Sequence, residues 1–138
     1  GKARVINETL SDLVILSFGN MLNLSMEIVD QINCSLVDMR FIKPLDEELI
    51  EKCAKKYKHI ITIEENVITG GAGSAVNEYL TKIRYSEKLK IFGIPDEFPI
   101  VGSQEDQRDA AGLTKDKILE SLASELNLKD LEKKVSAQ

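Results

Sequence analysis

Short apolar runs alternate with amphipathic segments along this chain, and the alternation predicts an α/β fold. Continuous apolar stretches of the kind found in strands buried on both faces of a sheet occur at residues 12–17, 34–37, 60–63 and 89–94. Residues 3–7 are a further short candidate. Because strands separated by amphipathic helices pair in parallel through right-handed crossovers, we expect residues 1–126 to form one three-layer α/β/α sandwich.

Helical spacing of apolar residues predicts helices at 21–32, at 46–57, at 73–84 and after Thr114. Asp46 is expected to cap the second of these helices, because two glutamates follow it in the positive first turn. Residues 96–113 contain Pro99, Gly102 and Gly112 and are predicted to be irregular. Residues 127–138 are charged and poor in apolar side chains, so we expect a disordered tail.

Composition narrows the classes of function. The net charge is −5, with no basic stripe that would neutralise phosphates, so we expect no nucleic-acid partner. No run approaches 18 apolar residues and no charged leader with an apolar core opens the sequence, so we expect neither a membrane span nor a signal peptide. Cys34 and Cys53 lie in apolar patterns and are expected to be buried thiols of a reducing compartment, which favours the cytoplasm.

The glycine-rich loop that follows the strand at 60–63 raises the question of a phosphate cradle. A dinucleotide fingerprint would need glycine where Val76 stands, and a P-loop would need a lysine that the loop lacks. Glu64 and Glu65 would also place negative charge beside a phosphate. We therefore expect Gly70, Gly71 and Gly73 to form a joint, supplying unusual φ values and a close approach of helix and sheet.

No catalytic constellation can be assembled from the remaining residues. Glu64 and Glu65 are adjacent, and on an extended chain their side chains point to opposite sides, so they cannot form a facing dyad. His59 is the only histidine, and it is isolated from groups with metal-ligand spacing. The serines lack the G-x-S-x-G context of an activated nucleophile. We expect no catalytic, cofactor-binding or metal-binding residue here.

Three motifs carry a resemblance to a known family. They are VDMRFIKPLDEELI at 37–50, ITIEENVITGGAGSAVNEYL at 61–80 and GIPDEFPIVGSQEDQRDAAGL at 93–113. In this order and spacing they resemble the C-terminal domain of the 1-deoxy-D-xylulose-5-phosphate synthases, a branch of the transketolase family, and the resemblance extends to about residue 126. It implies a mostly parallel five-stranded sheet with one antiparallel edge strand at residues 3–7.

The resemblance also implies a context for the domain. The parent enzyme would be a cytoplasmic homodimer that condenses pyruvate with glyceraldehyde 3-phosphate, using thiamine diphosphate and Mg²⁺ bound by upstream domains. Such enzymes supply precursors for isoprenoid, thiamine and pyridoxal synthesis. The metal-binding G-D-G motif and the catalytic histidines of the family are absent from this sequence. The resemblance therefore implies a packing module without activity of its own.

The surface that would meet the upstream domains is predicted at the carboxyl edge of the sheet. Loops 39–45, 64–73 and 95–102 all follow strand ends, so in a parallel sheet they share one edge. The candidate residues are Arg40, Phe41, Glu64, Glu65, Asn66, Gly70, Gly71, Gly73, Asp96 and Phe98. Exposed apolar residues in these loops would form a docking patch. The alternative is a free-standing regulatory α/β module that binds an anion at the glycine loop.

Overall fold

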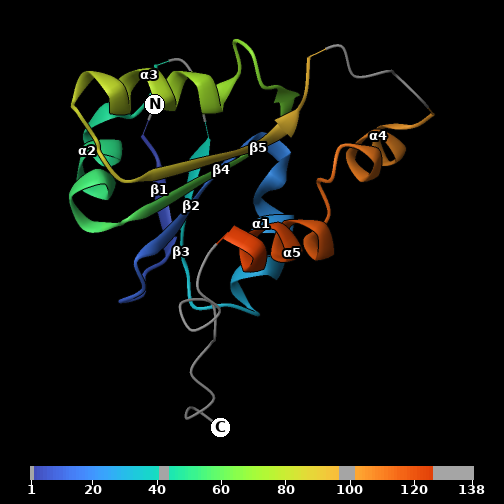
Figure 1. Cartoon of the computed structure of the whole chain (residues 1–138), viewed down its shortest axis with the longest axis horizontal. Coiled ribbons are helices and arrows are strands. Elements are labelled where there is room, and N and C mark those ends of the chain that lie inside the picture. The colour runs from blue at the N-terminus through green and yellow to red at the C-terminus, as the bar shows by residue number, and fades with distance from the viewer. Residues whose placement is uncertain (1, 41–43, 97–101, 126–138) are drawn as a thin grey trace, which may run out of the picture.

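The structure is a computed structural model of the chain, and it describes residues 2–40, 44–96 and 102–125. A single five-stranded sheet lies at its centre, in the strand order β1-β3-β2-β4-β5 (Figure 1). Strand β1 runs antiparallel to β3, and the other neighbours are parallel. The strands are β1 (Arg4–Asn7), β2 (Leu13–Phe18), β3 (Ser35–Arg40), β4 (His59–Val67) and β5 (Lys88–Ile94). The predicted mixed sheet with one antiparallel edge strand is confirmed.

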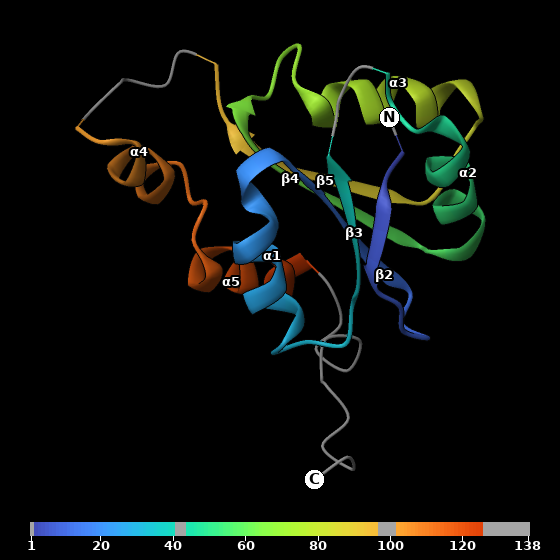
Figure 2. The same cartoon turned by 180° about the vertical axis from the view of Figure 1, so that it is seen from behind.

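Helices cover both faces of this sheet, as the sandwich prediction requires. The helices are η1 (Gly19–Met21), α1 (Leu22–Val29), α2 (Glu47–Lys56), α3 (Ala72–Lys82), α4 (Gln104–Ala110) and α5 (Lys115–Glu125). Helices α1 and α5 pack on one face, and α2 and α3 pack on the other, as the two opposite views show (Figures 1 and 2). Helix α4 lies beyond the layer formed by α1 and α5, and Lys117 of α5 donates to the carbonyl oxygen of Asp109 in α4 (Figure 1).

Two apolar cores, one on each face of the sheet, explain why five of the six residues of β2 are apolar. All six of its residues are buried. Leu13 and Ile15 contact the core beneath α1 and α5, whereas Val14 and Leu16 contact the core beneath α2 and α3. A strand in the middle of a doubly covered sheet has no face left for polar side chains, so its alternation disappears.

Helix α2 begins at the residue that the sequence predicted as its N-cap. The Asp46 carboxylate accepts the backbone N–H of Leu49 at 3.1 Å, which confirms Asp46 as the N-cap. Its second oxygen accepts the N–H of Ala3 at 2.9 Å. One side chain therefore caps a helix and also holds the segment that leads into β1.

The prediction of irregular structure for residues 96–113 was wrong in part, because α4 forms within it. Ser103 accepts the N–H of Asp106, and the Asp106 carboxylate accepts the N–H of Ser103, which is a complete capping box. The proline and glycine signals flank this helix rather than interrupt it. Residues 127–138, predicted to be disordered, lie outside the described residues.

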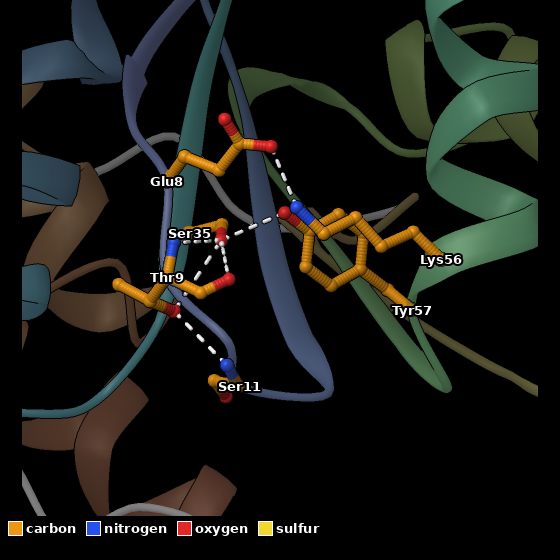
Figure 3. Close-up of polar contacts among 6 residues, drawn as sticks. All are labelled: Glu8, Thr9, Ser11, Ser35, Lys56 and Tyr57. Atoms are coloured by element: carbon orange, nitrogen blue, oxygen red, sulfur yellow. Dashed lines mark hydrogen bonds and ion pairs between the residues drawn. The ribbon is translucent and has the colours of Figure 1, made fainter.

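A polar network fastens the edge strand β1 to its neighbours (Figure 3). The Tyr57 hydroxyl donates to Ser35 Oγ at 2.8 Å, and the backbone N–H of Thr9 donates to the same oxygen at 2.9 Å. Lys56 Nζ lies 2.6 Å from Glu8 Oε1. These contacts join the loop after β1 to β3 and to the end of α2, so the short edge strand is held by side chains as well as by its ladder.

Replacing the capping carboxylate tests this reading of α2. We expect Asp46→Ala to lower the free energy of unfolding by about 1–2 kcal/mol, because a helix cap and the bond to Ala3 are lost together. Urea unfolding followed by circular dichroism measures the change. Glu48→Ala is the matched control, since Glu48 is exposed and its contact with Lys52 is a surface ion pair. Equal effects of the two substitutions would contradict the assignment.

Candidate functional site

Strand β4 does not end at Ile63, where the sequence pattern ended it, but continues to Val67. Its pairing with β5 shifts on the way: Ile63 lies opposite Phe92, and Val67 lies opposite Ile94. Residues 64–66 therefore face Gly93 alone, as a bulge on β4. A Cβ on Gly93 would lie 2.9 Å from a side-chain carbon of Ile68, so a larger residue would force its neighbours to move. The bulge sets the directions of Glu64 and Glu65.

The Glu64 side chain turns inward and closes the start of α3. It is 0% exposed, and its two carboxylate oxygens accept the backbone N–H groups of Ala72 at 2.7 Å and Gly73 at 2.6 Å. The N-cap residue, Gly71, has no side chain that could cap the helix. The free N–H groups and the positive end of α3 are thus satisfied by the chain's own carboxylate. This arrangement disfavours the anion-binding alternative, because the position that a phosphate would take is filled.

Burial and hydrogen bonding act in opposite directions on Glu64. Burial raises the pKa of its carboxyl group above the ordinary value of 4.5, and the N–H groups of Gly73 and Ala72 partly offset the rise. The folded chain therefore binds more protons at Glu64 than the unfolded chain does just above pH 4.5. It follows that the contribution of Glu64 to the free energy of unfolding decreases as the pH rises from 4.5 through its folded-state pKa.

The glycines of the loop divide between the two purposes expected of them, an unusual φ and a close approach of helix and sheet. Gly70 has a φ of +76°, the left-handed conformation that favours glycine. Gly71 has an ordinary φ of −85°, but a Cβ there would collide with Glu64 Oε1 and lie 2.5 Å from the Val67 carbonyl oxygen. A Cβ on Gly73 would lie 2.6 Å from Ile91. Unusual backbone geometry thus explains Gly70, and close packing explains Gly71 and Gly73.

Glu65 points to the opposite side of β4, as predicted for adjacent residues on an extended chain. Asn20 Nδ2, from η1, donates to Glu65 Oε2 at 3.1 Å. Arg108 Nη2, from α4, donates to the same oxygen at 3.1 Å, and Arg108 Nε lies 3.0 Å from Oε1. Asn20 and Arg108 were missed by sequence reasoning. They stand 45 and 43 residues from Glu65, and α4 itself was not predicted.

The predicted edge residues differ in exposure. Arg40, Asn66, Gly70 and Asp96 are exposed at the carboxyl edge, and Glu65 is half-buried. Glu64, Gly71 and Gly73 are buried beneath the edge. The expectation that these last three contribute to the surface was wrong, because they pack against one another around the start of α3. Phe41 and Phe98 lie outside the described residues.

The exposed part of the edge combines polar groups with a little apolar surface. Arg40 has a φ of +60°, and its backbone N–H donates to Asp38 Oδ1 at 3.1 Å. The Thr69 hydroxyl donates to the Asp96 carboxylate. Val67 is 45% exposed and is the one large apolar side chain that the described part of these loops exposes to this extent. The predicted apolar patch is therefore small within residues 39–40, 44–45, 64–73, 95–96 and 102.

The described residues offer little reactive chemistry. They contain no group of three or more His, Cys, Asp or Glu side chains that could hold a metal ion. Cys34 and Cys53 are free and buried, and burial raises the pKa of both thiols, that of Cys53 to about 11. Few thiolates would form near neutral pH, so neither cysteine is a reactive nucleophile. No helix in the described ranges is long and apolar enough to cross a membrane.

The geometry defines an α/β domain with a five-stranded sheet, in which the glycine-rich loop is a structural joint. Comparison with known proteins finds the same class of domain. Residues 1–118 match the family model described as "Transketolase, C-terminal domain". The chain belongs to this family.

Its relatives include full-length synthases. The chain is 44% identical over 120 residues to 1-deoxy-D-xylulose-5-phosphate synthase from Psychromonas ingrahamii, covering 83% of this chain and 19% of that protein. It is 42% identical over 127 residues to the synthase from Pseudoalteromonas translucida, covering 92% of this chain and 20% of that protein. The chain thus spans about a fifth of the length of these curated relatives.

A solved structure agrees with the fold. The chain resembles a split-gene transketolase, solved as an inactive beta4 tetramer, with a TM-score of 0.77 and 27% sequence identity. The match covers 89% of this chain and 41% of that one.

Matched asparagine substitutions separate the two roles of the loop glycines. Asparagine tolerates the left-handed conformation, so we expect Gly70→Asn to change the free energy of unfolding by less than about 1 kcal/mol. Gly71→Asn has the required φ but collides with Glu64 and Val67, and we expect it to cost about 1–3 kcal/mol. Urea unfolding measures both. If Gly70→Asn proves the more destabilising of the two, close packing is not what requires glycine at 71.

Proposed function

We propose that this chain is the C-terminal domain of a 1-deoxy-D-xylulose-5-phosphate synthase and that it acts as a packing module for the upstream part of that enzyme. The synthases to which the chain is similar support this identity of the parent enzyme. The observation that carries the packing role is the burial of Glu64 at the start of α3. Because the Glu64 carboxylate accepts the N–H groups at the glycine-rich start of α3, this helix start is a structural joint and leaves no anion site there.

The parent would join pyruvate to glyceraldehyde 3-phosphate with loss of carbon dioxide, using thiamine diphosphate and Mg²⁺. The described residues of this chain do not fit either group. A diphosphate would need free N–H groups or cations, and the N–H groups that open α3 already bind Glu64. Mg²⁺ would need clustered oxygen ligands, and none are grouped here. We infer that both groups bind in the upstream part of the parent, and we propose that this parent is a cytoplasmic homodimer.

The role of this domain in the parent follows from where its sheet ends. Its carboxyl edge presents Arg40, Asn66, Thr69 and Asp96 to solvent in the chain alone. Polar groups with scattered apolar contacts are typical of interfaces between domains of one chain. We infer that the upstream domains cover this edge and that the joint at Glu64 holds its loops in place for that contact.

The test compares the 138-residue chain with the parent enzyme that contains it. We expect the chain to fold by circular dichroism, to release no carbon dioxide from pyruvate and to give no calorimetric binding of thiamine diphosphate with Mg²⁺. The parent is expected to form 1-deoxy-D-xylulose 5-phosphate. Micromolar cofactor binding or decarboxylation by the folded chain would contradict the packing role. A parent that does not form this product would contradict its identity.

A further inference from the structure

The direction of strand β1 decides where the chain enters this domain. Strand β1 is antiparallel to β3, with Arg4 opposite Asp38 and Asn7 opposite Leu36, so its start lies beside the end of β3 (Figure 1). Strand β3 ends with Arg40 at the carboxyl edge of the sheet. A β1 strand parallel to the others would have started at the opposite edge. The residues that lead into β1 therefore lie at the carboxyl edge, at the end of that edge formed by β1 and β3.

Asp46 holds these leading residues against the start of α2. Its Oδ2 accepts the backbone N–H of Ala3 at 2.9 Å, across 43 residues of sequence. Its Oδ1 accepts the N–H of Leu49 at 3.1 Å and so caps the helix. The Ala3 side chain also packs against the apolar core beneath α2 and α3. Main chain and side chain of Ala3 are thus both held, whereas Lys2 before it is exposed.

We propose that Asp46 is a clamp that fixes the point at which the upstream part of the parent enters this domain. The inference rests on the proposed function, in which the connection between the two parts passes through residues 2 and 3. Because the clamp holds Ala3 at the β1 and β3 end of the carboxyl edge, the upstream part contacts that end, beside Arg40 and the first turn of α2. Strand β5 lies at the far end of the strand order, away from the connection.

The clamp requires two acceptor oxygens at residue 46, one for Leu49 and one for Ala3. Serine caps helices about as well as aspartate does, but it offers a single oxygen on a shorter side chain. Asp46→Ser is therefore expected to keep the cap and release Ala3, whereas Asp46→Ala loses both bonds. Glu48→Ala is the matched control, because it changes an exposed residue of the same helix turn.

Limited proteolysis of the parent enzyme with trypsin tests the clamp. Trypsin cleaves after lysine and arginine, and Lys2 and Arg4 flank Ala3. Cleavage there needs the local backbone to open. We expect a fragment that begins at Ala3 or Val5 to be released at least about fivefold faster from Asp46→Ser and Asp46→Ala than from the unsubstituted parent, because a hydrogen bond to a charged group is lost. The control should be cleaved at the rate of the unsubstituted parent.

Two further measurements complete the test. In the 138-residue chain, urea unfolding should show a smaller loss of stability for Asp46→Ser than for Asp46→Ala, since serine keeps the cap. Hydrogen exchange should be at least about tenfold slower in the parent than in the chain at the amides of residues 39–40 and 47–49, because a bound neighbour suppresses local opening.

Three outcomes would overturn the clamp. They are cleavage of Asp46→Ser no faster than that of the unsubstituted parent, fast cleavage of Asp46→Ser with the full stability loss of Asp46→Ala, and equal exchange of residues 39–40 and 47–49 in parent and chain. The second would show that the helix cap accounts for both effects. The proposed function fails separately, if the parent does not form 1-deoxy-D-xylulose 5-phosphate or if no part of the carboxyl edge gains protection in it. A protected edge with normal cleavage of Asp46→Ser contradicts the clamp alone.

Discussion

The bond between the Glu64 carboxylate and the first amides of α3 is the constraint around which the carboxyl edge is built. Three glycines surround this one side chain. A Cβ would collide with Glu64 Oε1 at Gly71, lie 2.9 Å from Oε2 at Gly73 and lie 3.2 Å from Cγ at Gly93. The bulge in β4 supplies the backbone path that brings the carboxylate to the helix. The glycine-rich loop resembles a phosphate-binding loop in its sequence, but it surrounds the Glu64 carboxylate of the chain itself.

The neighbouring carboxylate performs a related task on the other side of the sheet. Glu64 fixes α3, and Glu65 fixes α4 through Arg108. Adjacent residues on an extended strand point apart, so one short stretch of β4 orients elements on both sides of the carboxyl edge. This arrangement holds the loops on both sides of the carboxyl edge in place, which supports the proposed packing role.

The sequence predicted those features that depend on local pattern. Buried strands, amphipathic helices and the Asp46 cap all leave a signature within a few residues, and each was found close to its predicted place. The inward turn of Glu64 left none, because it depends on a bulge opposite Gly93, about 30 residues away. Helix α4 was not predicted, because the nearby proline and glycines indicated irregular structure and the capping box of Ser103 and Asp106 was not recognised. The sequence could not say which of the two expected reasons, close packing or an unusual φ, applies at Gly71, because both require the same residue.

The central claim is that Glu64 serves as the internal ligand of α3, and Glu64→Gln tests it most directly. Glutamine can accept one of the two N–H groups, but its amide nitrogen opposes the other. We expect urea unfolding to show a loss of about 1–3 kcal/mol, against little change for exposed Glu78→Gln on the same helix. Inorganic phosphate should not stabilise the unsubstituted chain. A Gln variant as stable as the original, together with stabilisation of the original by phosphate, would contradict the account.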